Sequence, residues 1–331
     1  MRAIVLKAPN EFSLEQVPMP APGPGQVLIR IEASPINPSD IVFLKGQYGT
    51  KKPFPVIPGF EASGTVVSSG GGLLAWRLVG KKVAVACEKG DGVWAEFAVA
   101  SAKSCVVLTD NIPFTLGCNF FANPLTAMMF MEKIKEGKHA AIVQTAACSA
   151  IGKMMVRYCK EEKIPCINVV RRQEQVDLLR SMGADYVLDS SIEGFQEELK
   201  KLSVNLNATL AFDCVSGEMT GILLNNMAEN SVVYVYGSLS MKPIGGINPS
   251  AVIFSGKRVE GLWLSQWVKK KGILSLWSTT NKIVSLLPTV LKTDVSAEFA
   301  LEQILDALKY YKANMTSGKV VLRPWLKLAD S

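Results

Sequence analysis

The sequence contains a single histidine, His139, among 331 residues. A metal site that needs two or more histidines is therefore excluded, and a serine or cysteine nucleophile could be activated only by this one imidazole. His139 follows Glu136-Gly137-Lys138 and leads into an apolar run. We therefore expect a partly exposed histidine at the edge of a strand.

The seven cysteines are too irregular for a disulfide framework or a zinc ribbon. Their number is odd, they are scattered, and no Cys-x-x-Cys occurs. This usage is typical of a reducing compartment. The chain also lacks an apolar run of about 18 residues that could cross a bilayer. Its N-terminus resembles neither a secretory signal nor a transit peptide, so we expect a cytoplasmic protein with no membrane partner.

Acidic residues are outnumbered, since 36 Lys and Arg against 29 Asp and Glu give a formal charge of +7. A basic surface attracts polyanions, from nucleic acid to phosphorylated small molecules. The basic residues are spread along the chain, with short clusters at Arg171-Arg172 and Lys269-Lys270-Lys271. No nucleic-acid motif occurs, so nucleic acid is not an expected partner.

Residues 1 to about 120 are predicted to form a compact, barrel-like unit of strands. Short apolar and β-branched runs recur there between breaks such as PMPAPGPGQ and FPVIPGFEASG. The expected strands are 3–6, 26–32, 64–68, 82–86, 94–98 and 105–108.

From about residue 123 strands and helices alternate, which predicts an α/β fold with a doubly wound parallel sheet. An amphipathic helix and a strand in the tail are expected to pack back onto the first unit. The expected strands are 140–143, 166–170, 186–188, 209–212, 232–236, 257–263 and, in the tail, 320–322. The expected helices are 125–134, 151–160, 173–182, 192–202, 219–227 and, in the tail, 301–311.

The turn QTAACSAIG, residues 144–152, lies where a dinucleotide-binding loop would follow the first strand of that sheet. Its glycine fingerprint is nearly absent, because only Gly152 matches and Ala147 and Ser149 hold the other positions. Small residues would still let backbone N–H groups approach a pyrophosphate, and Ser149 could cap the helix. A turn before any buried helix would look similar, so both interpretations stay open. The candidate pyrophosphate contacts are Ala147, Cys148, Ser149, Ala150 and Ile151.

The next helix and strand lead to NVVRRQEQ, where a nicotinamide site usually holds Asp or Glu for the ribose 2′-hydroxyl. Arg171 and Arg172 stand there instead. Guanidinium groups suit a phosphate dianion, although both could be solvated residues at a helix start. With the βαβ pattern around them, we favour a 2′-phosphate clamp and hence NADP(H) as the cofactor.

The ordered motifs of the whole chain resemble the zinc-free branch of the medium-chain dehydrogenase/reductase superfamily, which includes quinone oxidoreductases and enoyl-thioester reductases. The resemblance implies a GroES-like barrel domain, residues 1–120 and 285–331, and a Rossmann NADP(H)-binding domain, residues 121–284. It also implies a homodimer. The motifs on which the resemblance rests are, in chain order, ASPINPSD, LKGQYG, PVIPGFEASGTVVSSG, GKKVAV, GVWAEFA, ANPLTA, AACSAIG, LLRSMGADYVL, AFDCVSG, VYVYGSLS, GLWLSQW and SGKVVL.

Zinc-dependent relatives carry a metal-binding Cys near Ser39 and a His where Phe60 stands here. A phenyl ring cannot ligate zinc. Without a metal, hydride from NADPH needs an electron-poor acceptor, such as a quinone or an α,β-unsaturated carbonyl, whose developing oxyanion needs donors. The resemblance implies that Tyr48 is this donor, with Asn37 and Ser39 holding it or the carbonyl. Without the resemblance, Tyr48 would be a tyrosine in a surface turn.

The resemblance assigns the remaining candidates to the cofactor and the substrate, and each also has an ordinary structural explanation as a turn, core or solvated residue. Lys319 could approach the cofactor or the substrate. The other cofactor candidates are Thr126, Val215, Gly237, Ser238 and Leu239. The candidate walls of a substrate pocket are Trp263 and Trp267.

Three functions remain open. The first is an NADPH-dependent reductase of quinones or reactive enones. The second is a 2-enoyl-thioester reductase acting on CoA or acyl-carrier-protein substrates, which INVVRRQEQ and GLWLSQW favour. The third is a redox-inactive NADPH-binding or RNA-binding protein, which only the net charge supports.

Overall fold

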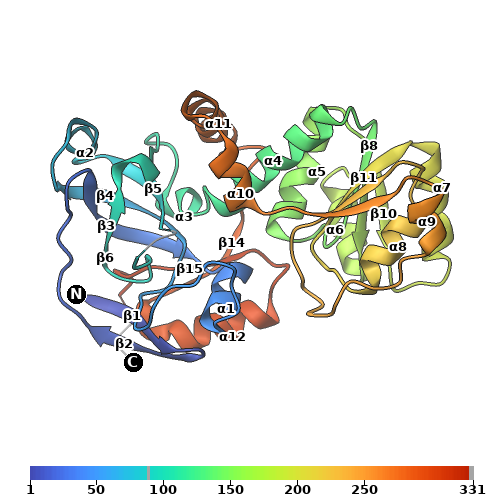
Figure 1. The fold of residues 1–331 in the computed structure, drawn as a ribbon. Coiled ribbons are helices and arrows are strands. Elements are labelled where there is room, and N and C mark those ends of the chain that lie inside the picture. Colours follow the sequence, from blue (N-terminus) through green and yellow to red (C-terminus); the bar gives the residue numbers. More distant parts are fainter. Residues whose placement is uncertain (88–89, 328–331) are drawn as a thin grey trace. The chain divides into compact units, whose positions relative to one another are not determined.

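The computed structural model describes residues 1–87 and 90–327 and divides into two compact units. Unit 1 combines Met1–Leu125 with Ser278–Ser331, and unit 2 is Thr126–Trp277. Unit 1 holds a seven-stranded sheet and a two-stranded sheet of β1 and β2, and unit 2 holds a six-stranded sheet (Figure 1). The helices α4 (Ala122–Glu136) and α11 (Ile273–Leu286) cross from one unit to the other along the chain.

Unit 1 is built on a seven-stranded sheet in the order β14-β15-β3-β4-β5-β7, in which β6 also pairs with β3. Alternate residues of β3, among them Val27, Ile29 and Ile31, are fully buried, as the two-residue period of a strand requires. The expected β-rich unit is therefore confirmed. Its strands are β1 (Arg2–Ala8), β2 (Glu11–Gln16), β3 (Gln26–Pro35), β4 (Glu61–Ser69), β5 (Lys82–Ala86), β6 (Phe97–Ser101), β7 (Cys105–Val107), β14 (Val295–Phe299) and β15 (Lys319–Leu322).

The strand expected at 94–98 begins later, as β6, because its first residues serve another partner. The backbone N–H of Ile4 donates to the carbonyl of Trp94 at 2.9 Å, and Ala95 bridges to Ala3. Short helices join the strands of unit 1. They are α1 (Pro38–Leu44), α2 (Leu73–Leu78), η1 (Ala102–Ser104), α3 (Phe114–Gly117), η2 (Leu301–Gln303) and α12 (Ile304–Ala313).

The tail packs onto unit 1, as its amphipathic pattern predicts. β15 pairs with β3 in antiparallel fashion and with β14 in parallel fashion. α12 buries Ile304, Ala307, Leu308 and Tyr311, whose spacing places them on one face of a helix.

Unit 2 carries a six-stranded, wholly parallel sheet in the order β10-β9-β8-β11-β12-β13. This is the doubly wound arrangement that the alternating pattern predicts. Its strands are β8 (Ala141–Gln144), β9 (Cys166–Val170), β10 (Tyr186–Asp189), β11 (Ala208–Asp213), β12 (Val232–Val235) and β13 (Arg258–Gly261). Its helices are α5 (Ala150–Glu161), α6 (Gln173–Ser181), α7 (Phe195–Asn205), α8 (Glu218–Asn226), α9 (Pro249–Ile253) and α10 (Leu264–Lys270).

Helix boundaries differ from expectation where the backbone leaves the helical region. α7 begins at Phe195 rather than at residue 192, because Gly194 has a φ of 80° and ends the preceding turn. Within the described part of the chain, no helix is both long and apolar enough to cross a membrane.

Candidate functional site

The carboxyl ends of β8 and β11 form the point at which the strand order of unit 2 reverses. In open α/β sheets ligands bind in the crevice at this point, because the loops after the two strands diverge. β8 and β11 are neighbours in the sheet, with β9 beyond β8 and β12 beyond β11. The turn at 144–152 and the loops after β11 and β12 therefore belong to one region of the sheet.

A buried hydrogen-bond pair fixes the two sides of this crevice. The hydroxyl of Thr145, directly after β8, donates to Oδ1 of Asp213 at the end of β11 over 2.8 Å. The same hydroxyl accepts from the backbone N–H of Cys214 at 3.0 Å. Asp213 accepts further bonds from the N–H of Val215 at 2.9 Å and the hydroxyl of Thr220 at 2.7 Å. The loop after β11 is thus folded around one buried carboxylate.

The start of α5 has the geometry that a pyrophosphate turn needs. Ser149 caps the helix, since its hydroxyl accepts from the N–H of Gly152 at 3.1 Å. A Cβ on Gly152 would lie 2.4 Å from the carbonyl oxygen of Ala147, so only glycine allows this approach of helix and turn. The cap that the sequence predicts for Ser149 is confirmed. Ala150 and Ile151 follow in the first turn of the helix, whose N–H groups point away from its body.

Buried amides hold the neighbouring strand in place. Nε2 of Gln144 donates to Oδ1 of Asn168 on β9 at 2.7 Å and to the carbonyl of Gly152 at 3.1 Å. β9 then ends, and Arg171 and Arg172 follow as exposed residues before α6. The guanidinium groups therefore stand at the carboxyl end of the second strand, where the sequence predicts them.

The loops after β11 and β12 are bonded to each other. The backbone N–H of Leu239 donates to the carbonyl of Cys214, and that of Ser240 donates to Val215, both at 2.9 Å. Gly237 approaches Cys214 so closely that a Cβ would lie 3.1 Å from the Cβ of that cysteine. Val215, Gly237, Ser238 and Leu239 are therefore brought together with the crevice of unit 2.

Cysteine and histidine contribute no reactive group at this crevice. All seven cysteines are free thiols. Cys148 is buried, its Sγ lies 3.5 Å from the carbonyl of Gln175, and burial raises the pKa of its thiol. His139 lies before β8, with Nδ1 2.7 Å from the hydroxyl of Thr209, and partial burial lowers the pKa of its imidazole. The partly exposed strand-edge histidine is confirmed.

Unit 1 holds a second polar feature, a buried cluster that we call the charged cluster: Asn37, Asp40, Glu61 and Lys319. The amide Nδ2 of Asn37 donates to Oε1 of Glu61 at 2.9 Å, and Nζ of Lys319 donates to Oδ1 of Asn37. The other carboxylate oxygen of Glu61 accepts from the N–H groups of Phe121 and Ala122 at 2.7 and 3.0 Å. Glu61 thereby ties β4 to the first residues of α4.

Asp40 completes the charged cluster at the start of α1. Its carboxylate accepts from the N–H of Asn37 at 2.8 Å and from the N–H of Phe60 at 3.2 Å. Burial raises the pKa of Asp40 to about 7, and the nearby Glu61 adds to this while Lys319 opposes it. Burial also raises the pKa of Glu61 and lowers that of Lys319.

Tyr48 and Ser39 lie on the segments that flank the charged cluster. The rings of Tyr48 and Phe60 are 4.9 Å apart between centroids, and both rings pack against the core of unit 1. Ser39 is half-buried within α1, two residues after Asn37. Asn37 is bonded to both Glu61 and Lys319, which the sequence did not predict.

The two candidate tryptophans differ in environment. Trp267 is buried in α10, and its Nε1 donates to Oε1 of Glu132 on α4 at 2.9 Å. The ammonium of Lys271 lies 4.7 Å from the centre of its ring and pairs with the same carboxylate. Trp263 is 40% exposed at the start of that helix. Thr126 lies half-buried in α4.

Sequence reasoning missed the residues that hold these regions together, above all Thr145, Asp213, Asp40 and Glu61. Each one stands within or beside a segment already marked as a motif, namely QTAACSAIG, AFDCVSG, INPSD and PGFEASG. For Thr145 and Asp213 the available signal was a polar residue at the end of an apolar strand, because a buried polar group needs a partner.

Two family models cover most of the chain. The alcohol dehydrogenase GroES-like domain matches residues 23–110, and the zinc-binding dehydrogenase domain matches residues 150–279. A mitochondrial enoyl-[acyl-carrier-protein] reductase from Caenorhabditis elegans is 30% identical over 81% of this chain and 78% of its own length. The corresponding protein from Xenopus tropicalis is 31% identical over 78% and 74%. The chain belongs to the medium-chain dehydrogenase/reductase superfamily.

Solved structures of other superfamily members agree with this assignment over the full length. A protein from Mesorhizobium loti assigned as an NADPH:quinone reductase is 32% identical, covers 98% of both chains and has a TM-score of 0.89. A second protein of that assignment, from Bacillus thuringiensis, is 24% identical with a TM-score of 0.88 and shows the shared fold.

This superfamily member lies in the zinc-free branch. Ser39 and Phe60 stand where zinc-dependent relatives carry ligands. Across residues 1–87 and 90–327, no group of three or more His, Cys, Asp or Glu side chains is arranged to hold a metal ion. The expected fold, a GroES-like domain with a Rossmann domain, is confirmed.

Proposed function

We propose that this protein is a zinc-independent, NADPH-dependent reductase that transfers hydride to a quinone or an α,β-unsaturated carbonyl. The observation that carries the proposal is the crevice of unit 2, where a capped helix start, two further loops and a pair of arginines gather at the carboxyl ends of parallel strands. The relatives are reductases of electron-poor acceptors, in agreement with this chemistry.

The residues of unit 2 fit NADP(H). The turn before α5 and the first turn of that helix, with Ala147, Cys148, Ser149, Ala150 and Ile151, hold the pyrophosphate. The Ser149 hydroxyl and the backbone N–H groups bind it, except those of Ala147 and Ser149, which donate to the carbonyls of Val169 and Ala146. The close approach of Gly152 to Ala147 keeps this turn compact. Arg171 and Arg172 bind the 2′-phosphate, since no carboxylate stands there to accept a 2′-hydroxyl. The remaining contacts are Thr126 for the carboxamide, Val215 for the ribose, and Gly237, Ser238 and Leu239 beneath the nicotinamide.

The residues of unit 1 supply hydrogen-bond donors to the acceptor. The bound nicotinamide supplies the hydride. Tyr48 donates its phenolic proton to the oxyanion or the adjacent carbon, and Ser39 binds the carbonyl. Asn37 and Lys319 act through the charged cluster, because their polar atoms are bonded to each other and to Glu61. On this view Lys319 is a positioning residue rather than a cofactor ligand. Residues 1–120 and 285–331 form the catalytic domain, and residues 121–284 form the cofactor domain.

The test is NADPH oxidation by the full chain with a quinone, a short enone and an enoyl-CoA in parallel. We expect turnover with the quinone or the enone, and Tyr48→Phe should lower kcat while NADPH affinity stays unchanged. Turnover with enoyl-CoA alone would replace the proposal with the thioester reductase. Tight NADPH binding without turnover on any acceptor would favour the redox-inactive binding protein.

The cofactor assignment has its own test. Arg171→Ala/Arg172→Ala should weaken NADPH binding by about tenfold to a hundredfold and leave NADH binding unchanged, because a charge-assisted contact contributes about 1.5–3 kcal/mol. Arg180→Ala, at an exposed position in the last turn of α6, is the matched control. Equal affinity of the unaltered protein for NADPH and NADH would contradict the clamp.

A 2-enoyl-thioester reductase is the second candidate, and one comparison favours it. The enoyl-[acyl-carrier-protein] reductases are relatives at about 30% identity over most of the chain. Trp263, 40% exposed at the start of α10, is the better candidate for an acyl wall, because Trp267 is engaged by Glu132 and Lys271. Trp263→Ala should raise the KM for enoyl-CoA without changing NADPH binding if this function holds.

The protein acts as a homodimer through the edge of the unit 2 sheet. β13 is the last strand of that sheet, and its neighbour α9 carries exposed apolar residues, with Phe254 82% exposed just beyond the helix. An edge strand pairs readily with a second copy around a twofold axis. Sedimentation velocity should give a dimer that Phe254→Ser weakens; a monomer at all concentrations would contradict this assembly.

The location that we propose for the protein is the cytoplasm, and fractionation of the native protein tests it.

A further inference from the structure

The short helix α2 of unit 1 presents apolar side chains to solvent. Leu73 is 73% exposed, Leu74 is 50% exposed and Trp76 is 70% exposed, whereas Ala75 and Leu78 are buried beneath them. Such large apolar groups usually lie inside a protein, so their concentration on one turn of helix needs an explanation.

A rigid backbone holds this helix. The N–H of Gly25 donates to the carbonyl of Gly71 and the N–H of Trp76 donates to Gly72, both at 2.9 Å. A Cβ on Gly70 would lie 2.1 Å from the carbonyl oxygen of Gly23, so the loop before α2 is pressed against the proline-rich loop 18–25. The backbone before α2 is therefore bonded to and packed against loop 18–25.

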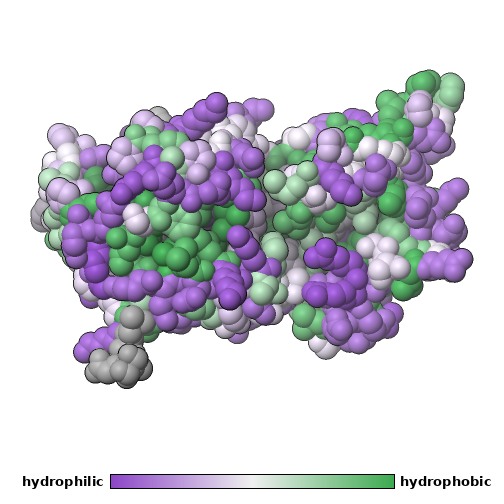
Figure 2. Space-filling view, turned by 90° about the horizontal axis from the view of Figure 1, so that it is seen from below, coloured by the Kyte–Doolittle hydropathy of each residue, from purple (hydrophilic) through white to green (hydrophobic). Residues whose placement is uncertain are grey.

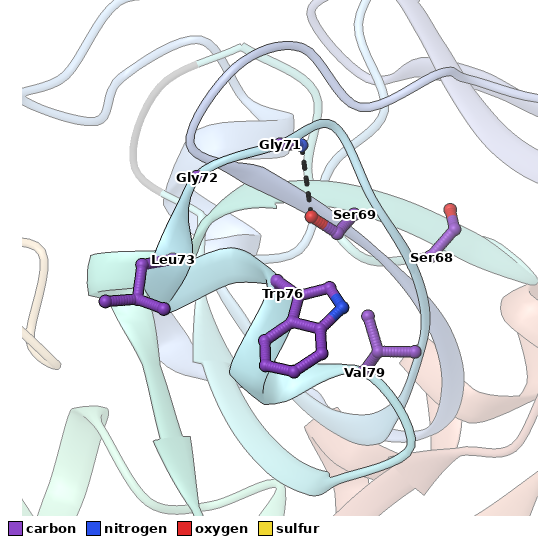
Figure 3. A pocket seen from close by; sticks show the side chains of 7 residues that line it. All are labelled: Ser68, Ser69, Gly71, Gly72, Leu73, Trp76 and Val79. Carbon is purple, nitrogen blue, oxygen red and sulfur yellow. Dashed lines mark hydrogen bonds between the residues drawn. The ribbon is translucent and has the colours of Figure 1, made fainter.

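Leu73, Trp76 and Val79 line an open depression of about 740 Å³ together with Ser68, Ser69, Gly71 and Gly72. Figure 3 shows the three apolar side chains spread across one side of the helix, with the Trp76 ring between the other two. The dashed bond from the Gly71 N–H to the Ser69 hydroxyl, 3.1 Å long, closes the far rim. The surface is broad and shallow, and its apolar groups stand out from it.

The α2 face combines apolar side chains with basic charge. Apolar side chains also reach solvent on the face drawn in Figure 2, so exposure alone does not mark a site. Residues 62–87, which include α2, contain no Asp or Glu, and neither do the loop 18–25 and η1, which pack against α2 or the loop before it. They do contain the exposed cations Arg77, Lys81 and Lys103, and also Lys82, whose ammonium lies 4.8 Å from the ring centre of Phe114.

We propose that the α2 face docks the protein on an anionic lipid surface. Leu73, Leu74 and Trp76 enter the interfacial region of the leaflet, where Trp and Leu side chains are favoured. Arg77, Lys81 and Lys103 attract the lipid headgroups around them. The sequence predicted no membrane partner because no segment spans a bilayer. Peripheral contact of this kind needs no spanning helix, and it is independent of the proposed reductase activity.

The test is co-sedimentation of the full chain with vesicles of phosphatidylcholine alone and with vesicles that also contain phosphatidylglycerol. We expect binding to the anionic vesicles that falls as salt is raised, since salt screens the headgroup attraction. Leu73→Ser/Trp76→Ser should reduce the partition coefficient by at least about tenfold, because two large apolar side chains no longer enter the leaflet. Arg77→Gln/Lys81→Gln should reduce binding to anionic vesicles only.

Leu305→Ser is the matched control, because Leu305 is also in unit 1 and is 70% exposed but stands beside Glu302 and Asp306. Its vesicle binding should equal that of the unaltered protein. Equal binding to neutral and anionic vesicles, or equal loss in Leu305→Ser, would overturn the proposal. So would a change in sedimentation coefficient of Leu73→Ser/Trp76→Ser without lipid, since the α2 face would then be an interface between copies of the chain.

Discussion

The two units bury polar side chains in contrasting ways. At the crevice of unit 2, one carboxylate, Asp213, is surrounded by neutral donors, and the other bonds there join amides and hydroxyls. In unit 1, two carboxylates and one ammonium, those of Asp40, Glu61 and Lys319, are buried together. The desolvation of buried charge is costly unless each charge keeps its partners. The charged cluster should therefore be the more sensitive of the two to single substitutions and to pH.

Loss of the buried ammonium should have the largest effect. Lys319→Ala leaves Glu61 and Asp40 buried without their cation and should lower the free energy of unfolding by about 3–5 kcal/mol. Urea denaturation followed by circular dichroism measures this. Lys45→Ala, at an exposed position in the same unit, is the control and should change it by less than about 0.5 kcal/mol. Equal effects of the two substitutions would show that the buried carboxylates of the charged cluster do not depend on Lys319 for stability.

The pH dependence of stability should come next. Because the pKa of Asp40 is raised to about 7 in the folded protein, the native state holds its proton more tightly than the unfolded state. The stabilisation of the folded state by this group is present at low pH and is lost as pH rises from about 4 to about 7, by about 4 kcal/mol. Glu61 contributes in the same direction, and Lys319 and Tyr311 are the other titratable groups around Asp40.

Asp40→Asn should reduce the fall in the free energy of unfolding between about pH 4 and about pH 7. Unfolding free energies measured across that pH range for both proteins provide the comparison. A slope that persists unchanged in the variant would assign the pH dependence to other carboxylates.

A substitution at the crevice of unit 2 should lower the free energy of unfolding by less than Lys319→Ala does. Thr145→Val removes the donor to Asp213 and the acceptor for Cys214, which should lower the free energy of unfolding by about 1–3 kcal/mol. NADPH binding should weaken as well, because the two loops lose their connection. Thr109→Val removes an exposed hydroxyl and serves as the control. If Thr145→Val costs as much as Lys319→Ala, the contrast between the units is wrong.

The smallest effect is expected at the helix cap. Ser149→Ala removes one hydroxyl that accepts from the N–H of Gly152 and should cost about 1 kcal/mol. Isothermal titration with NADPH should also show a modest loss of affinity, and Ser181→Ala near the end of α6 should show none. A stability unchanged by Ser149→Ala would mean that the first turn of α5 is held without its cap.

The fold of unit 2 was readable from the sequence because each strand is a short apolar run followed by an amphipathic helix. β9 (Cys166–Val170) was predicted with its observed bounds. In unit 1, β2 and β14 were missed. Their residues alternate between polar and apolar types, but neither short strand contains a buried residue. The long helix α11 was missed because many of its apolar residues face solvent, among them Ile273 at 87% exposed, which blurs the helical pattern.

Some features of the candidate site could also be predicted from the sequence, and others could not. Ser149 and Gly152 were predictable because capping and close packing depend on residues a few positions apart. The bond between Thr145 and Asp213, and the bonds of Glu61 to Asn37 and to the start of α4, join residues far apart along the chain. No local pattern encodes such pairs. Only the arrangement of strands brings them together.

The central claim is hydride transfer from NADPH without a metal, and isotope transfer tests it directly. Protein treated with a chelator is supplied with NADPH deuterated at the transferring C4 position and a short enone, and the reduced product is analysed by mass spectrometry. We predict one deuterium at the β-carbon of the product, at a rate unchanged by the chelator. A product without label, or a reaction that stops when metal is removed, would contradict the account.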